Sequence, residues 1–253
     1  TNYDFELGKG TLSVTKALLN VRAENKKRIY GQSNPSLTYM IDGYLNNDGL
    51  NVVSGAPVLS TLATTASGAG DYEISLTAGT LAATNYTFSL VPGKLTIDRA
   101  TLTVKAADKN KIYGAVNPDL TFTFNGFQNG DNSSVVSGLP VLSTSATQSS
   151  GAGTYPISIA SGSLTASNYT FTMADGNLVI GKAKLVVRAS NQSRSYGAAN
   201  PSFTAVYNGL VNGDQIGNIN LNGTISFSTL ANTSSAVGDY DITVASSTLT
   251  SPN

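Results

Sequence analysis

The side chains of this sequence that could do chemistry recur at one fixed interval. Asp48, Asp131 and Asp214 follow one another every 83 residues, and a carboxylate in a turn could hold Ca²⁺. A calcium site needs about six to eight oxygen ligands, with several carboxylates close together. Each of these turns supplies one repeated Asp, which an Asx turn explains without a metal ion. We therefore predict no metal site, while the sequence leaves calcium at the three turns open.

Nucleophilic catalysis of the usual kinds is not available to this chain. It contains no His and no Cys, so neither a Ser nor a Cys nucleophile would have its customary base. The acids outside the repeat pattern, such as Glu6, Glu24 and Asp175, fall on predicted strand edges or turns and form no pair suited to sugar chemistry. We predict no enzymatic activity, no catalytic residue and no cofactor.

A motif of the form Tyr-Gly-x-x-Asn-Pro occurs three times at the same spacing. Its residues are Tyr30, Gly31, Asn34 and Pro35, then Tyr113, Gly114, Asn117 and Pro118, then Tyr196, Gly197, Asn200 and Pro201. The tyrosines could stack on sugars. They could instead pack under the Asn-Pro loop, with the following Gly in a backbone conformation that other residues resist. Because the whole loop repeats, we interpret the motif as structural.

A basic cluster at 26–28 lies in a predicted loop of the first copy. It thins to Lys109 and Lys111 in the second copy and to Arg194 in the third, so we interpret it as a solvated loop. A Lys–Asn isopeptide crosslink would need a Lys at one repeat position, and Gln192 takes the place of Lys109 in the third copy. The sequence therefore argues against such a crosslink.

The composition excludes two classes of partner. Charged residues make up 12% of the chain, with 15 basic and 15 acidic residues that leave no net charge. A nucleic-acid or anionic-membrane binder would carry a basic surface, and no apolar run approaches the roughly 18 residues of a membrane span. We expect no nucleic-acid partner and no direct membrane insertion. A Cys-free composition rich in Ser, Thr and Asn is typical of exported bacterial surface proteins, which indicates the cell exterior.

The chain is an array of one module. About half of the positions from 17 to 99 are identical to those from 100 to 182, and such arrays must be recognised before local motifs are interpreted. We predict closing strands of a preceding repeat at 1–16, repeats at 17–99 and 100–182, and a third repeat at 183–253 that lacks its closing strands. A spacer or adhesive module is copied to gain length or valency.

Alternating apolar residues predict an all-β module. In the second copy, strands are expected around 102–106, 120–124, 135–136, 141–142, 155–159, 169–173 and 178–180, with a polar crossing at 108–117. A single helical turn at 133–137 stays open as an alternative. The last strand of one copy runs into the first strand of the next without a Gly/Ser or Pro-rich linker. The prediction is an elongated, semi-rigid rod of three units, roughly 100 Å long.

Three motifs together carry a family resemblance. Tyr-Gly-x-x-Asn-Pro, then Gly-Phe-x-Asn-Gly-Asp, then Gly-x-Gly-x-Tyr-x-Ile resemble the MBG repeats of the Tyr-Gly-x type, over essentially the whole chain. The resemblance implies a mostly-β variant of the β-grasp, an extracellular location in large bacterial surface proteins, and no catalysis. Asn47 stands where the other copies have Gly130 and Gly213. Gly70-Asp71-Tyr72 and its counterparts also resemble the tyrosine corner of immunoglobulin-like sandwiches, which stay open as the alternative.

These observations lead to two functional hypotheses. The first is a non-enzymatic structural segment, a stalk or fibre, of a secreted or cell-surface bacterial adhesin or surface filament. The second is a multivalent module in which each repeat binds a host glycan or surface protein weakly. A ligand face would lie at 131–140 and its counterparts, which vary most between copies. The ligand, the host and the length of the parent array stay open.

The chain ends are out of phase with the repeats. Asn2 and Tyr3 align with Asn168 and Tyr169, and Asn253 aligns with Asn168 once two inserted residues are counted. The third repeat therefore stops before the counterparts of 169–173 and 178–180, which leaves strand edges unpaired. We expect either an excerpt from a longer array or a head-to-tail assembly with neighbouring copies. In that assembly, residues 1–16 of one copy complete the third repeat of the next by strand donation, which gives an open filament.

Overall fold

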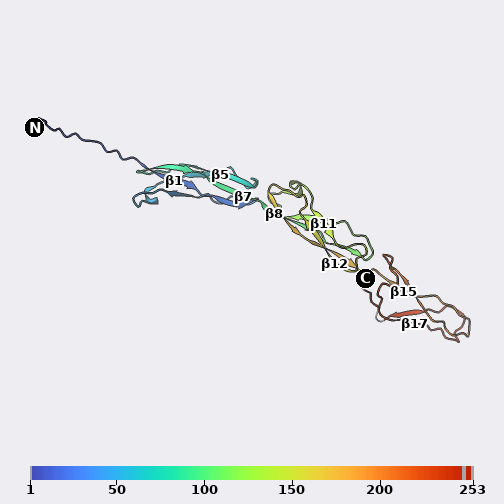
Figure 1. The fold of residues 1–253 in the computed structure, drawn as a ribbon. Helices are drawn as coiled ribbons and strands as arrows, with labels where there is room; N and C mark the ends of the chain where they lie inside the picture. The colour runs from blue at the N-terminus through green and yellow to red at the C-terminus, as the bar shows by residue number, and fades with distance from the viewer. Residues whose placement is uncertain (1, 247–248, 252–253) are drawn as a thin grey trace. The chain divides into compact units, whose positions relative to one another are not determined.

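A computed structural model describes residues 2–246 and 249–251 of the chain. The described residues are almost entirely β-strand, turn and loop, with short 3-10 turns at Leu50–Val52 (η1) and Ser133–Val135 (η2) (Figure 1). Contacts between residues divide the chain into two compact units. The first comprises Thr1–Leu102, Gly126–Ser137 and Thr165–Thr170, and the second comprises Thr103–Asn125, Gly138–Leu164 and Phe171–Asn253. The all-β prediction is confirmed.

Residues 17–98, all of them described, form the strands of the first repeat. These are β1 (Ala17–Ala23), β2 (Lys26–Ile29), β3 (Tyr39–Asp42), β4 (Val58–Ser60), β5 (Gly70–Thr77), β6 (Tyr86–Val91) and β7 (Gly93–Asp98). One sheet has the order β3-β1-β6 and the other has the order β2-β7-β5-β4. The chain passes from the first sheet to the second between β1 and β2, between β3 and β4, and between β6 and β7.

The first and last strands of the repeat run parallel and side by side through both sheets. Ala17 is paired with Tyr86 at the start of β1, and Ile29 is paired with Asp98 at the end of β2. The register stays constant across the crossing, where a side chain on Gly93 would lie 2.7 Å from the Ala23 carbonyl oxygen. A glycine is therefore needed where the two strands change sheet together.

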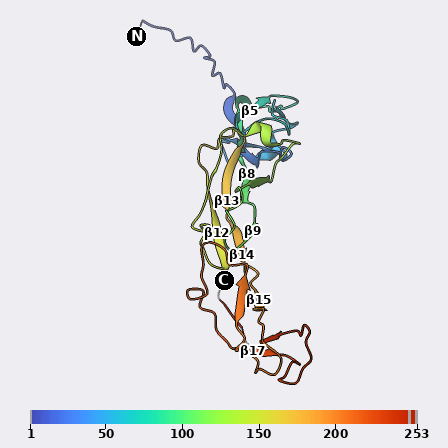
Figure 2. The same cartoon turned by 90° about the vertical axis from the view of Figure 1, so that its right-hand side faces the viewer.

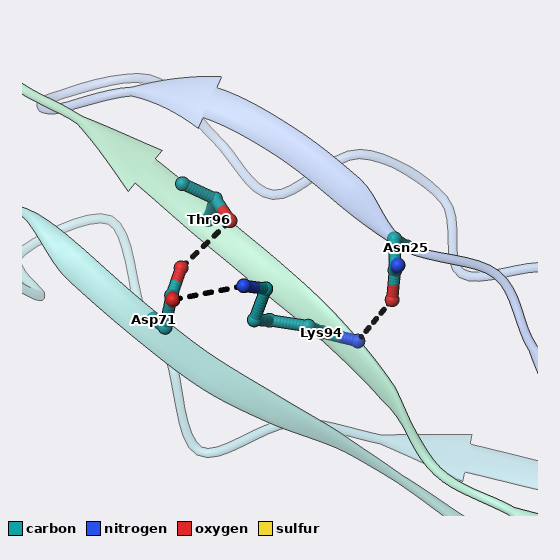
Figure 3. Close-up of polar contacts among 4 residues, drawn as sticks. All are labelled: Asn25, Asp71, Lys94 and Thr96. Atoms are coloured by element: carbon teal, nitrogen blue, oxygen red, sulfur yellow. Dashed lines mark hydrogen bonds and ion pairs between the residues drawn. The ribbon is translucent and has the colours of Figure 1, made fainter.

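Polar side chains fasten this crossing. The Lys94 backbone N–H donates to Asn25 Oδ1 at 2.8 Å (Figure 3). On the neighbouring strands, Asp71 of β5 accepts from Thr96 Oγ1 at 2.7 Å and from Lys94 Nζ at 3.0 Å. The hydrogen bond from Thr96, followed by that from Lys94, lowers the pKa of the Asp71 carboxyl. In the second repeat, Asp108 takes the place of Asn25, with its Oδ1 accepting from the backbone at 2.8 Å.

The second repeat reproduces this topology. Its strands are β8 (Ala100–Ala106), β9 (Lys109–Ile112), β10 (Phe122–Asn125), β11 (Val141–Thr144), β12 (Gly153–Ala160), β13 (Tyr169–Ala174) and β14 (Gly176–Gly181). The sheets have the orders β10-β8-β13 and β11-β12-β14-β9, and β8 and β13 lie side by side in Figure 2. One residue, Arg99, separates the last strand of the first repeat from β8, as the absence of a linker predicts.

Two local predictions for the second repeat are wrong. The polar crossing at 108–117 contains β9, which pairs parallel with β14. Its inward residue is Lys111, so no apolar alternation marks it. Val135 and Val136 do not form a strand piece. Asn132 Oδ1 instead accepts the Ser134 backbone N–H at 2.9 Å and begins the 3-10 turn η2, as Asn does at helix starts.

Inward-facing residues on alternate positions of these strands build the core. Leu102 and Val104 of β8, Ile157 of β12 and Leu178 of β14 are fully buried. Burial of this kind contributes about 1.5–3 kcal/mol per large aliphatic side chain. The alternation that predicted the strands is thus the alternation between core and solvent.

The topology bears on the two fold alternatives. The parallel pair formed by the first and last strands differs from an immunoglobulin constant-type domain, which consists of two antiparallel sheets. The tyrosine corner is nevertheless present as a local device. Tyr72 donates its hydroxyl to the Gly68 carbonyl at 3.0 Å. Tyr155 and Tyr240 repeat that bond to the carbonyl four residues upstream, at 3.1 Å each.

The third repeat has shorter strands. They are β15 (Val186–Ala189), β16 (Ala205–Asn208), β17 (Ile225–Ser228) and β18 (Thr243–Ser246), paired as β15-β16 and β17-β18. Residues 192–195, the counterpart of β9, form no strand. Asn253, whose alignment with Asn168 defines the predicted end of this repeat, lies outside the described residues. At the other end, residues 2–16 form no strand and lead away from β1 as an extended trace (Figure 1).

Candidate functional site: the junction between repeats

Arg28 is buried and links two loops by hydrogen bonds, an arrangement that we call the clamp. The prediction that Arg28 belongs to a solvated loop is wrong. Arg28 lies on β2 and is only 5% exposed. Its Nε donates to Asn34 Oδ1 at 2.8 Å and its second guanidinium nitrogen donates to the Thr64 carbonyl at 2.5 Å. Asn34 in turn donates to the Ala63 carbonyl at 2.6 Å. The motif asparagine thereby ties its own loop to the loop after β4, and the buried charge is satisfied by hydrogen bonds.

The clamp recurs in the third repeat. Arg194 Nε donates to Asn200 Oδ1 at 2.8 Å and its guanidinium also donates to the Asn232 carbonyl. Asn200 donates to the Ala231 carbonyl at 2.8 Å. The signal that could have revealed the clamp in the sequence is a basic residue two positions before each motif tyrosine.

Lys111 fills the clamp position of the second repeat incompletely. Its Nζ donates to the Ala115 carbonyl at 2.9 Å and to the Thr147 carbonyl at 2.7 Å. Asn117 keeps its bond to the Ala146 carbonyl, at 2.6 Å. Within the described part of the chain, however, the buried Asn117 Oδ1 has no hydrogen-bond partner. An ammonium has no counterpart of the Arg Nε–H that satisfies this oxygen in the other copies.

Tyr30 packs against the next repeat. It is 5% exposed, and its hydroxyl donates to Asp131 Oδ2 at 3.0 Å. Tyr169 of β13 donates to the same oxygen at 2.7 Å. The rings of Tyr30 and Tyr169 meet edge to face, with centroids 5.6 Å apart, and Phe127 packs edge to face on Tyr169 at 5.7 Å. Such aromatic pairs contribute about 0.5–1.5 kcal/mol beyond their burial.

The Asp131 carboxylate organises this junction. Burial of Tyr169, together with its hydrogen bond to Asp131 and the charge there, raises the pKa of Tyr169 to about 12. Asp48 occupies the corresponding position in the first repeat and accepts from Tyr86 at 2.6 Å, a bond that raises the pKa of Tyr86. At Asp48 and Asp131, tyrosine hydroxyls donate to the repeated carboxylate.

Hydrogen bonds between main-chain groups of the first repeat and asparagine side chains of the second complete the first junction. The Ala69 backbone N–H donates to Asn168 Oδ1 at 2.9 Å, and Asn129 Nδ2 donates to the Thr65 carbonyl at 3.0 Å. Gly31 has a φ of +87°, and a side chain there would lie 2.6 Å from Gln128 Cβ. A glycine is required twice over, by its backbone conformation and by the approach of the next repeat.

The second junction uses the counterparts of these residues. Tyr113 is 7% exposed, and its hydroxyl accepts from Asn212 Nδ2 at 3.5 Å. Gly114 has a φ of +82°, and a side chain there would lie 2.6 Å from Val211 Cγ2. In the third copy, Gly197 keeps a φ of +83° while Tyr196 is 70% exposed. The motif prolines Pro35, Pro118 and Pro201 are half-buried.

The other residues considered from the sequence form no reactive or metal-binding group. Among the described residues, no cluster of three or more His, Cys, Asp or Glu could hold a metal ion. Glu24 accepts from Lys26 Nζ at 3.1 Å, and Asp175 Oδ1 accepts the Ile159 backbone N–H at 2.9 Å, while Glu6 is exposed. Asn47 adopts a left-handed φ of +62°, as Gly130 does at +77°, so the departure at Asn47 preserves the turn.

The family comparison agrees with the repeat structure. The family model for the MBG domain (YGX type) matches residues 19–96, 102–179 and 185–253. No curated protein matches the sequence. MBG repeats form a non-catalytic family that is typical of extracellular surface proteins. In the described part of the chain, no helix is long and apolar enough to cross a membrane.

Proposed function

Because the chain belongs to the MBG family of the YGX type, we propose that it is a non-enzymatic structural segment of a bacterial extracellular adhesin or surface filament. The observation that supports this proposal is the difference in exposure between the three motif tyrosines. Tyr30 and Tyr113, which are followed by another repeat, are 5% and 7% exposed, whereas Tyr196 is 70% exposed. The family signature therefore joins one repeat to the next.

The same observation weighs against tyrosine-based ligand binding. A sugar-stacking platform needs an open aromatic face, and the rings of Tyr30 and Tyr113 are occupied at the junctions. The Asp131 carboxylate, a group that could bind a sugar hydroxyl, accepts two tyrosine hydroxyls instead. A multivalent glycan- or protein-binding module therefore remains a weaker proposal, because no contact among the described residues favours it.

Scattering in solution tests the proposal. Three units of this size joined at defined junctions should give an elongated particle of roughly 100 Å, and Tyr30→Ala should broaden its distribution of lengths by loosening one junction. Tyr196→Ala is the matched control, because that ring is exposed, and should leave the profile unchanged. A compact wild-type particle would refute the structural role. Saturable binding on a glycan array that survives Tyr30→Ala would support the binding module instead.

A further inference from the structure

Tyr30 and Tyr169 are two phenol rings in direct contact at the first junction, and we call them the tyrosine pair. Tyr30 follows β2 of the first repeat and Tyr169 begins β13 of the second. They are 5% and 1% exposed, and their rings meet edge to face with centroids 5.6 Å apart. Both hydroxyls donate to Asp131 Oδ2, at 3.0 Å and 2.7 Å, so they lie within two hydrogen-bond lengths of each other. The hydroxyl ends of the two rings therefore converge.

Asp131 supplies what the one-electron oxidation of a phenol needs. A tyrosine hydroxyl has an ordinary pKa of about 10, and it becomes strongly acidic when the ring loses an electron, so a hydrogen-bonded base takes up its proton. An ionised carboxylate is such a base, because it offers only acceptor oxygens. Tyr155, in the same repeat as Asp131, donates instead to the Gly151 main-chain carbonyl, which is a far weaker base. Loss of an electron is therefore easier at the tyrosine pair than at a tyrosine bonded to a carbonyl.

A second contact between tyrosines shows the difference that the shared carboxylate makes. Tyr44 and Tyr86 also meet edge to face, with centroids 6.3 Å apart. Tyr86 donates to Asp48, but within the described part of the chain the Tyr44 hydroxyl has no hydrogen-bond partner. Only one ring of that contact can therefore transfer its proton to a carboxylate directly.

The composition of the chain directs oxidation towards tyrosine. The chain contains no Cys and no Trp, and only two Met. Thiols and thioethers are common sites of protein oxidation, and the indole ring also loses electrons readily. Within a chain of this composition, the tyrosine pair combines ring contact with a shared proton acceptor.

We propose that Tyr30 and Tyr169 are a site of oxidative crosslinking, at which an outer-sphere one-electron oxidant joins the two rings by a carbon–carbon bond. Each ring in turn gives one electron to the oxidant and its hydroxyl proton to Asp131, from which the proton passes to water. The two phenoxyl radicals couple through the ring carbons next to the oxygen-bearing carbons. The hydrogens on the coupled carbons then move to the oxygens and restore two phenols. The chain has lost two electrons and two protons, and the oxidant has been reduced twice.

The crosslink makes the first junction permanent. It adds a covalent bond to the hydrogen bonds that join the first and second repeats, and it closes a loop from residue 30 to residue 169. A disulfide that closes a long loop stabilises a protein mainly by restricting the unfolded chain, and a bond between two tyrosines acts in the same way. Disulfides persist in oxidising environments outside the cell, and MBG repeats are typical of extracellular proteins. The tyrosine pair gives a chain without Cys a covalent crosslink under those conditions.

Light-driven oxidation of the full chain tests the crosslink. Illuminated tris(bipyridine)ruthenium(II) with persulfate generates ruthenium(III), a one-electron oxidant, and dilute protein favours reaction within one chain. The monomer should lose two hydrogen atoms in mass, gain dityrosine fluorescence and yield two peptides joined at Tyr30 and Tyr169. Tyr30→Phe should abolish this product. The matched control is Tyr155→Phe, which removes a hydroxyl bonded to a main-chain carbonyl and should keep the product. A wild-type monomer without the Tyr30–Tyr169 link overturns the proposal, as does an unchanged dityrosine yield in Tyr30→Phe.

Asp131→Asn tests the proton acceptor separately. An amide keeps a carbonyl oxygen that can accept the hydroxyls but is no base, so the yield of the Tyr30–Tyr169 link at neutral pH should fall severalfold. Raising the pH towards about 10, where tyrosine hydroxyls ionise, should restore the yield in Asp131→Asn, because the proton is then lost to water. An undiminished yield at neutral pH overturns the role of Asp131. A yield that stays low in alkali overturns it too, because the carboxylate would then only hold the rings in place.

Discussion

Tyr30 of the first repeat donates its hydroxyl to Asp131 of the second repeat at 3.0 Å, across 101 residues of sequence. The oxygen that receives this bond also accepts the hydroxyl of Tyr169, which belongs to the same repeat as Asp131. One carboxylate therefore couples the internal structure of a repeat to its attachment to the preceding one. A substitution on either side of the junction should therefore change the stability of the other side.

Removing the Tyr30 hydroxyl should weaken the first junction. Tyr30→Phe keeps the ring but leaves Asp131 with one tyrosine donor, and loss of a hydrogen bond to a charged group costs about 1.5 kcal/mol. The measurement is local hydrogen exchange around 126–131. Tyr196→Phe, at an exposed ring, is the control and should leave exchange in its own repeat unchanged. Equal protection in Tyr30→Phe and the wild type would contradict the coupling.

The pKa of Tyr169, raised to about 12, predicts instability in alkali. The unfolded chain has a tyrosine pKa of about 10, so the folded protein holds this proton more tightly. The stabilisation is complete below a pH of about 10 and is lost as the pH rises towards about 12. Tyrosinate absorbance during an alkaline titration should include a component from Tyr169 that titrates near a pH of about 12. Asp131→Asn should lower that pKa, and an unchanged titration would contradict the assigned cause.

Substitutions at Gly114 and Gly197 distinguish the cost of backbone strain from the cost of contact with the next repeat. Both have a positive φ, and a non-glycine residue there costs about 1–2 kcal/mol. A side chain at Gly114 would also meet Val211, whereas at Gly197 it would meet no atom within 4 Å among the described residues. Gly114→Ala should therefore lower the calorimetric melting temperature more than Gly197→Ala does. Equal shifts would show that the close approach contributes nothing.

Lys111→Arg should stabilise the second repeat. An arginine can donate from Nε to Asn117 Oδ1, which the lysine leaves unsatisfied, and satisfying a buried acceptor contributes about 1 kcal/mol. Arg28→Lys in the first repeat is the reverse change and should destabilise that repeat. Hydrogen exchange resolves the two effects, because stability is measured locally at 141–160 and 58–77. Faster exchange in Lys111→Arg would mean that the guanidinium does not fit.

The sequence predicted those parts of the fold in which apolar residues alternate. Strands such as β8 and β14 bury alternate residues along their length, so their period of two is visible in the chain. Strand β9 was missed because its inward residue is Lys111, a polar group held by carbonyls. Arg28 was misjudged for the same reason, since a buried guanidinium and a solvated one look alike in sequence.

The junction lay beyond prediction for a different reason. The recurrence of the tyrosine motif identified it as structural, but the partners of Tyr30 lie about a hundred residues later in the chain. No local pattern says which surface of one repeat meets the next. The comparison between copies carries that information, because the same tyrosine is buried in two environments and exposed in the third.

The parallel pairing of first and last strands has a mechanical consequence. A tension applied to the two ends of a repeat pulls β1 and β7 in opposite directions along a ladder that runs from the Ala17–Tyr86 pair to the Ile29–Asp98 pair. The hydrogen bonds between parallel strands then resist in shear, and many must break together before the chain can lengthen. Strands joined by a hairpin would instead unzip one bond at a time. The first and second repeats, which contain such parallel pairs, should therefore extend abruptly at a high threshold and not yield gradually.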